Sequence, residues 1–312
     1  MNLRYLAPPW STLVVALGTA HSAEPPHSLQ LTAQTEQADA ELGEPIYLTV
    51  RLHNLGADAA EVTPLLDPED GHVSVLVDGP SGRRLGYLPL SLRDTLGSSA
   101  PTRLAPGQSV SATLPIFFGA SGWTFTQPGA YRVRASYRTS PDAIAVESAT
   151  LTIEVRPGEA DLRSLLSNDE ASNEAGKFLV WRSGDHLTKG RALLKALTEQ
   201  GPDSRLRDHY RVAEARSWSH GFRNYVTGQA READFTQTLQ ALEGVREDRL
   251  PGTVRVEKLL AEAAGLYATG QPQAASATLA RANALVDARE ELGGYLPPVR
   301  RLREEMAEPP AR

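Results

Sequence analysis

Apolar and polar residues alternate along several short segments in the first half of the chain. Within 46–52 every second residue is apolar, and the segment runs into an Asn-Leu-Gly sequence typical of a turn. An apolar residue at every second position lines one face of a half-buried β-strand. Because these strands are separated by Gly- and Pro-containing turns with no helical period between them, they predict an antiparallel β-sandwich. The same alternation recurs in 73–77, 110–116, 131–137 and 149–155.

The pattern changes after Pro157 and Gly158. Beyond this point apolar residues recur three, four and seven positions apart, as at Leu193, Leu194 and Leu197. This spacing lines one face of an α-helix, and Ser, Asp or Thr near the starts with Gly or Pro near the ends supports the interpretation. The second half therefore predicts about six to eight helices packed in antiparallel pairs.

The length and composition agree with two folded units. The chain has 312 residues, of which 41% are hydrophobic and 22% charged, as in globular proteins. Because 312 residues are many for a single core, the change of pattern is interpreted as a domain boundary. The predicted fold is multidomain, with an antiparallel β-sandwich domain at 28–156 and an all-α helical bundle at 160–306.

The β-sandwich resembles a known class. The stretches "LGEPIYLTVRLHNLG", "LAPGQSVSATLPIF" and "FTQPGAYRVRASY" are similar to the Ig-like domains of exported bacterial proteins. The resemblance covers about 28–156 and implies that Tyr131 lies at a corner near the start of a late strand, with its hydroxyl bonded to the backbone. The Cys pair of many Ig domains is missing. Since such sandwiches serve adhesins, enzyme appendages, inhibitors and assembly factors, the resemblance implies a fold and no single function.

One helical hairpin also resembles a known repeat. Small and apolar residues across 259–282, with Gly270 between the two helices, resemble the spacing of a tetratricopeptide (TPR) hairpin. There is one copy of this pattern. Because a lone hairpin cannot bury its own apolar face, a small helical bundle with a TPR-like hairpin is favoured over a repeat array.

The first residues predict export. Residues 1–23 contain Arg4 as their one charge, an apolar run at 13–17 and small residues just before Glu24. This order is typical of a bacterial secretory signal peptide, cleaved to leave Ala23 or Glu24 at the N-terminus. The run is too short to span a bilayer, so a periplasmic or secreted protein without integral membrane association is expected.

Motifs for catalysis and cofactors are absent from the sequence. Without Cys, thiol chemistry and Cys-ligated metals are excluded, and the seven His residues include no pair at helical metal-ligand spacing. There is no Gly-x-Ser-x-Gly elbow and no phosphate loop, and with a net charge of −6 neither half shows a basic excess. We expect a non-enzymatic protein with no cofactor and no nucleic-acid partner. A hydrolase assembled from distant residues and a proteinase inhibitor are the alternatives.

A group of acidic residues precedes Gly71. Hard oxygen ligands this close together could bind Ca²⁺, although Pro68 restricts how they converge and the spacing differs from that of an EF-hand. A turn with solvated carboxylates is the other interpretation. The group consists of Asp67, Glu69 and Asp70.

Two sets of residues are candidates for a protein-binding surface. Three arginines share the polar face of the predicted strand 131–137 and its end, and form either a binding stripe or a solvated face. Four aromatic residues surround a Gly-Ala-Ser-Gly loop, where they either form a recognition surface or fill the core. The predicted function is binding or scaffolding through protein–protein contacts. The two sets are Arg132, Arg134 and Arg138, and Phe117, Phe118, Trp123 and Phe125.

Overall fold

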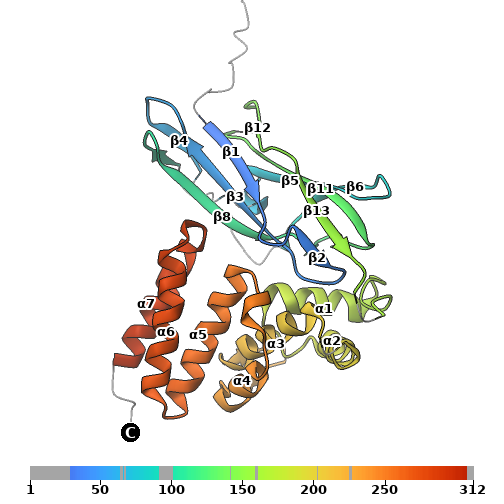
Figure 1. Ribbon diagram of the computed structural model, residues 1–312, viewed down its shortest axis with the longest axis vertical. Helices are drawn as coiled ribbons and strands as arrows, with labels where there is room; N and C mark the ends of the chain where they lie inside the picture. The colour runs from blue at the N-terminus through green and yellow to red at the C-terminus, as the bar shows by residue number, and fades with distance from the viewer. Residues whose placement is uncertain are drawn as a thin grey trace, which may run out of the picture.

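The computed structural model describes residues 29–63, 66, 68–90, 101–140, 142–158, 161–201, 203–224 and 227–307. Strands form the first part of the chain and helices pack beneath them as the second part (Figure 1). The fold is therefore mixed α and β, as predicted at this coarser level. The predicted signal peptide at 1–23 lies outside the described residues.

The strands form two larger sheets and several short pairs. One sheet has the order β2-β13-β11-β5-β6 with β12 beside β11, and the other has the order β1-β3-β8. All pairings are antiparallel except that of β2 with β13. The strands are β1 (Leu29–Gln34), β2 (Asp39–Glu41), β3 (Tyr47–Asn54), β4 (Ala60–Val62), β5 (Val73–Asp78), β6 (Arg84–Tyr87), β7 (Thr102–Leu104), β8 (Ser109–Pro115), β9 (Phe118–Gly119), β10 (Gly122–Trp123), β11 (Gly129–Tyr137), β12 (Val146–Glu147), β13 (Leu151–Arg156), β14 (Phe222–Arg223) and β15 (Ala230–Arg231).

The predicted register of β11 is confirmed. Val133 pairs with Val77 of β5 and with Leu151 of β13, and its side chain is fully buried. Arg132, one position earlier, is exposed. The alternation holds along the strand because the central position of β11 in its sheet leaves one face for the core and one for solvent.

Val133→Ala is expected to lower the free energy of unfolding by about 1 to 3 kcal/mol, because it removes buried methyl groups and leaves a void. Arg132→Ala is expected to change it by less than about 0.5 kcal/mol, because the side chain is exposed. Urea denaturation of the two variants measures the contrast. An exchange of the two outcomes would mean that the strand is shifted by one residue.

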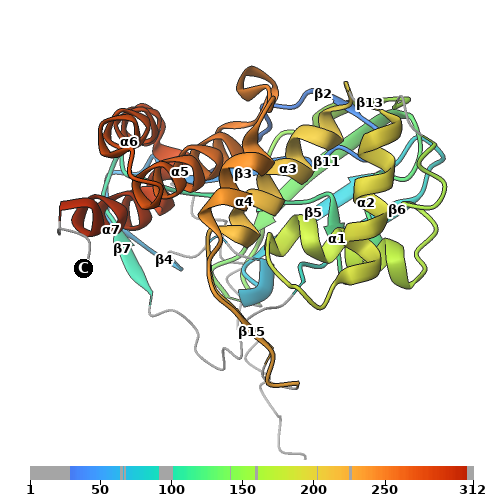
Figure 2. The same cartoon turned by 90° about the horizontal axis from the view of Figure 1, so that it is seen from below.

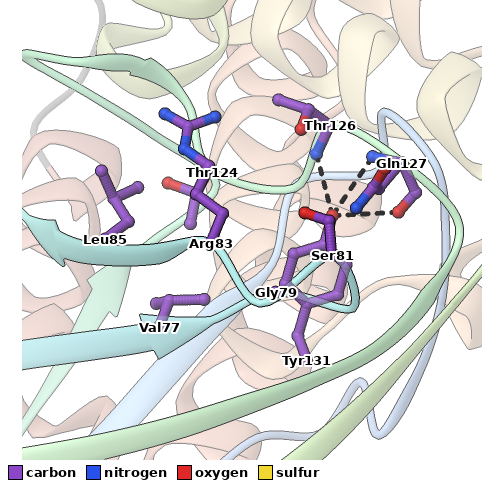
Figure 3. A pocket seen from close by; sticks show the side chains of 9 residues that line it. All are labelled: Val77, Gly79, Ser81, Arg83, Leu85, Thr124, Thr126, Gln127 and Tyr131. Carbon is purple, nitrogen blue, oxygen red and sulfur yellow. Dashed lines mark hydrogen bonds between the residues drawn. The ribbon is translucent and has the colours of Figure 1, made fainter.

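Tyr131 occupies the corner that the Ig-like resemblance implied. Its hydroxyl oxygen accepts hydrogen bonds from the backbone N–H groups of Thr126 (3.1 Å) and Gln127 (3.2 Å) and donates to the Gln127 carbonyl at 3.0 Å (Figure 3). The predicted contact of this hydroxyl with the backbone is confirmed. The cavity beside it measures about 20 Å³, enough for about one water molecule and too small for a ligand.

The described part of the second half contains seven α-helices, in agreement with the predicted range. Side chains of Asp169, Ser204 and Asp234 accept hydrogen bonds from the first turns of α1, α3 and α4, which explains where these helices begin. The helices are α1 (Glu170–Trp181), α2 (Thr188–Gln200), α3 (Arg205–Trp218), α4 (Phe235–Leu242), α5 (Gly252–Ala268), α6 (Pro272–Asp287) and α7 (Leu296–Ala307), with 3-10 turns η1 (Pro68–Asp70), η2 (Glu247–Arg249) and η3 (Glu290–Tyr295).

Helices α5 and α6 form the predicted hairpin. Gly270 adopts a φ of 80° in the turn between them, a conformation that favours glycine. Ala263 and Ala282 are fully buried where the two helices approach, and α7 packs against the same apolar cluster. The hairpin is therefore part of a three-helix group, and its assignment to the TPR class stays a prediction.

The strand and helix parts share one apolar core. Phe178 and Leu179 of α1 belong to the same buried cluster as residues of β5 and β11. Gly176 of α1 faces the ring of Phe118, so the absence of a side chain lets the helix approach the strands. The change of pattern at Pro157 and Gly158 marks a boundary between strands and helices, and the apolar core continues across it. The division into two domains stays a prediction.

Candidate functional site

Four aromatic residues predicted as part of an interaction surface lie in the core instead, each at most 4% exposed. The physical reason is that α1 covers the loop they surround: the indole N–H of one of them donates to Ser172 at 3.1 Å. The interpretation that they fill the core is therefore correct, and the surface interpretation is wrong. The residues are Phe117, Phe118, Trp123 and Phe125.

The predicted arginine stripe lies on the solvent face of β11. Arg132 and Arg138 are exposed and Arg134 is partly exposed. Arg134 forms an ion pair with Glu147 at 3.2 Å. A hydrogen bond from Arg84, together with the charges of Arg132 and Arg134, lowers the pKa of Asp78. The carboxylates of Glu147 and Asp78 thus lie close to the arginines of the stripe. The role of the stripe in binding stays a prediction.

The possible Ca²⁺ group cannot be placed as a whole. Asp67 lies outside the described residues, and Glu69 belongs to the short turn η1. Among the residues that the structure describes, no group of three His, Asp or Glu side chains is arranged to hold a metal ion. Nor does any helix in the described ranges combine the length and apolarity needed to cross a bilayer.

Two adjoining hollows in the helical part form the main candidate site, here called the helical cleft. The outer hollow measures about 810 Å³ and the inner one about 300 Å³, and Arg216 and His220 line both. In Figure 2, α4 lies beside α3 and α7 beside α5, and the outer hollow is lined from all four of these helices or their ends. The remaining outer residues are Ser219, Gly221, Ala233, Phe235, Leu260, Ala264, Pro297, Pro298, Arg301, Leu302 and Glu305, and the remaining inner residues are Trp181, Arg182, Ser183 and Glu257.

Arg182 connects the inner hollow to the rest of the fold. It ends α1 in a left-handed conformation (φ 51°), and its N–H donates to the Phe178 carbonyl at 2.7 Å. Its guanidinium donates to Glu257 of α5 at 2.5 Å and to the Tyr47 hydroxyl of β3 at 2.6 Å, and the Tyr295 hydroxyl donates to the same Glu257 oxygen at 2.6 Å. This network joins α1, α5, η3 and β3 at one point.

Burial determines the charge states in this network. It opposes the charge of Arg182, but the Glu257 carboxylate, Tyr47 and Tyr295 together outweigh this effect and raise the pKa of the guanidinium. Burial also raises the pKa of Tyr47 and of Tyr295. The network therefore holds an ion pair flanked by two neutral phenols at neutral pH.

Unusual backbone and unpaired polar atoms gather at this point. Left-handed φ values are uncommon for residues other than Gly, and in the described part of the chain Arg182 shares this feature with Asn168 alone. The indole nitrogen of Trp181 and the second carboxylate oxygen of Glu257 are buried without a hydrogen-bond partner. Strained residues and unsatisfied polar groups are concentrated at functional sites, and both kinds occur together beside the inner hollow.

His220 and Arg216 stand where the two hollows meet. The His220 Nδ1 atom lies 3.0 Å from the Arg216 carbonyl oxygen. In the tautomer that donates to this carbonyl, Nδ1 carries the proton and Nε2 is left as an acceptor. Partial withdrawal from water and the Arg216 guanidinium lower the pKa of His220, with Arg301 adding to the effect, so the imidazole is neutral at pH 7. The Arg216 guanidinium forms no hydrogen bond or ion pair with the described residues.

Ser219 and His220 have the residue types of a hydrolase nucleophile and base, and the Ser219 Oγ atom lies 2.8 Å from His220 Nδ1. Oγ also donates to the Arg216 carbonyl at 3.0 Å, the same oxygen that His220 Nδ1 contacts. In the tautomer that donates to this carbonyl, both protons point at one oxygen, whereas in the other tautomer Nδ1 accepts the Ser219 hydroxyl proton. The contacts of this pair fit both tautomers, and a hydrolase stays the alternative.

The sequence did not indicate the helical cleft. Its polar residues come from the end of α1, the end of α3 and the middle of α5, and Arg182 and Glu257 are 75 positions apart. The structure buries His209 within α3 and leaves His220 exposed beyond the end of that helix.

No protein-family model and no curated protein matches this chain. Solved structures match in part: a β-glucosidase from Listeria innocua in complex with glucose (17% identity, 41% of this chain, 16% of that chain, TM-score 0.24), a β-glucosidase from Erythrobacter marinus (19%, 41%, 15%, 0.25) and the alkylpurine DNA glycosylase AlkC from Pseudomonas fluorescens bound to DNA (13%, 41%, 30%, 0.25). This chain thus spans less than a third of each of these chains. TM-scores this low establish no shared fold, and no family is assigned.

Proposed function

We propose that this protein is an exported, non-enzymatic binding protein that holds a segment of a partner protein in the helical cleft. The observation that carries the proposal is the outer hollow of about 810 Å³, whose lining combines apolar residues with charged and polar ones. Its volume lies in the range of ligand-binding clefts. The strand part, which we propose to be an Ig-like β-sandwich, and the TPR-like hairpin serve as the scaffold that positions the lining residues.

The lining of the outer hollow is partly apolar. Phe235 begins α4, Leu260 and Ala264 lie on α5, and Pro297 and Leu302 belong to α7. Charged and polar groups from the end of α3 and from α7 complete the lining. A protein segment offers both apolar side chains and polar groups, which favours such a ligand over a purely apolar one.

Site-specific crosslinking tests this function. A photo-crosslinking residue at Leu302 in the cleft is expected to form adducts, in native periplasmic extract, that map repeatedly to one segment of one partner. A synthetic peptide of that segment should then bind the purified protein, and Ala264→Leu, which narrows the cleft, should weaken it. The matched control carries the crosslinker at Ile144, an exposed apolar residue (50%) before β12.

The two positions also separate the alternatives. Adducts at Ile144 with none at Leu302 would contradict the proposal and favour an inhibitor that acts through a loop of the strand part. Adducts at neither position, or adducts at Leu302 that share no segment, would also contradict it.

Export is tested separately. Mass spectrometry of the mature protein from its native host is expected to find Ala23 or Glu24 at the N-terminus, because the small residues before Glu24 match the specificity of signal peptidase. An intact N-terminus beginning at Met1 in the cytoplasm would contradict export and leave the binding proposal unaffected.

A further inference from the structure

We infer that the helical cleft recognises an acidic side chain of its partner, which pairs with Arg216 where the two hollows meet. This inference rests on the proposed binding function and specifies the chemistry of the bound segment.

The charges that line the cleft leave one cation without a partner. Arg182 is paired with Glu257 at 2.5 Å, and Arg301 with Glu305 at 2.9 Å. Arg216 has no such carboxylate among the described residues, although it is only partly exposed. A guanidinium that is partly withdrawn from water and unpaired is a ready site for a carboxylate, which can accept two parallel hydrogen bonds from it.

The charges of the residues that line the cleft also limit the ligand to one anionic group. Three guanidinium groups and two carboxylates line the two hollows, so the local formal charge is +1, inside a chain whose net charge is −6. A polyanion would need several unpaired cations, as nucleic-acid sites provide. A ligand segment with a single acidic side chain between apolar residues fits this lining. Its carboxylate can pair with the one free guanidinium, and its apolar side chains can contact Phe235, Leu260 and Leu302.

His220 adds a dependence on pH. In the tautomer whose Nδ1 donates to the Arg216 carbonyl, a second proton enters at Nε2. The charged groups around it are Arg216 on α3, Arg301 and Glu305 on α7, and Arg231 of β15, whose Nη1 donates to the His220 carbonyl at 3.3 Å. A bound carboxylate favours the imidazolium, so binding takes up a proton and becomes tighter as the pH falls from 8 to about 5.5, above the range where the ligand carboxyl is itself protonated.

Three labelled peptides test the inference: Ac-Ser-Leu-Ala-X-Leu-Ala-Ser-amide, with Glu, Gln or Lys at X. The Glu peptide is expected to bind about tenfold more tightly than the isosteric Gln peptide, the increment of a charge-assisted hydrogen bond, and the Lys peptide most weakly. Fluorescence anisotropy at pH 8, 7 and 5.5 measures the affinities. Arg216→Gln should abolish the preference for Glu over Gln, and His220→Gln should abolish the pH dependence.

The control variant is Arg300→Gln, which removes the same charge from an exposed residue of α7 that does not line the cleft. It should keep the preference for Glu, and circular dichroism with thermal unfolding checks that every variant is folded. Equal affinity of the Glu and Gln peptides, or equal effects of Arg216→Gln and Arg300→Gln, would overturn the acidic anchor while leaving the binding function in place. If none of the three peptides binds and no segment is crosslinked at Leu302, the proposed function itself fails.

Discussion

Arg182→Met is expected to lower the free energy of unfolding by about 3 to 5 kcal/mol, because it leaves the Glu257 carboxylate buried without its counter-ion. The side chains of Arg182 and Glu257 are 15% and 8% exposed, so the carboxylate is largely withdrawn from water. The Tyr47 hydroxyl loses its guanidinium donor as well. Guanidinium chloride denaturation of the variant and the parent protein measures the difference.

Two comparisons show whether burial is the cause. Removing both charges with Arg182→Met and Glu257→Gln together should recover part of the loss, because no uncompensated buried charge is left. Arg163→Met breaks the ion pair between Arg163 and Asp161, which are 91% and 54% exposed, and should change the free energy of unfolding little. If Arg182→Met costs no more than Arg163→Met, the buried pair does not stabilise the fold.

Gly176→Ala is expected to lower the free energy of unfolding by up to about 2 kcal/mol. A Cβ atom at this position would lie far inside van der Waals distance of the Phe118 ring, which is itself buried at 1% exposure. Overpacking of a dense core forces backbone shifts that typically cost about 1 to 3 kcal/mol, and this contact is close enough to exceed the gain of about 1 kcal/mol from replacing Gly in a helix.

Thermal and urea unfolding of Gly176→Ala measure the effect. Gly86→Ala in β6 is the matched control, because a Cβ atom there meets nothing within 4 Å, and it should change stability little. Adding Phe118→Leu to Gly176→Ala should relieve the overlap, although it also removes buried aromatic area. If Gly176→Ala is as stable as the parent protein, the close packing of α1 on the strands is not as described.

Local patterns in the sequence predicted the elements that depend only on neighbouring residues. The alternation around Val133 predicted β11 and its register, because a strand in the middle of a sheet needs period two whichever strands flank it. Gly270 between two apolar helices predicted the turn of the hairpin, because the φ of 80° found there is a property of one residue. The contact of the Tyr131 hydroxyl with the backbone followed from the Ig-like resemblance.

Contacts between distant residues could be found only in the tertiary structure. The sequence determined strand and helix periodicity, and through it the mixed composition of the fold. It left open whether Phe118 and Trp123 face solvent or core, since that depends on where α1 packs. The helical cleft likewise exists because α3, α5 and α7 converge, which brings Arg216 beside Arg182 and Arg301. Periodicity records which face of an element is buried but not which other element covers it, and that is decided by packing over the whole chain.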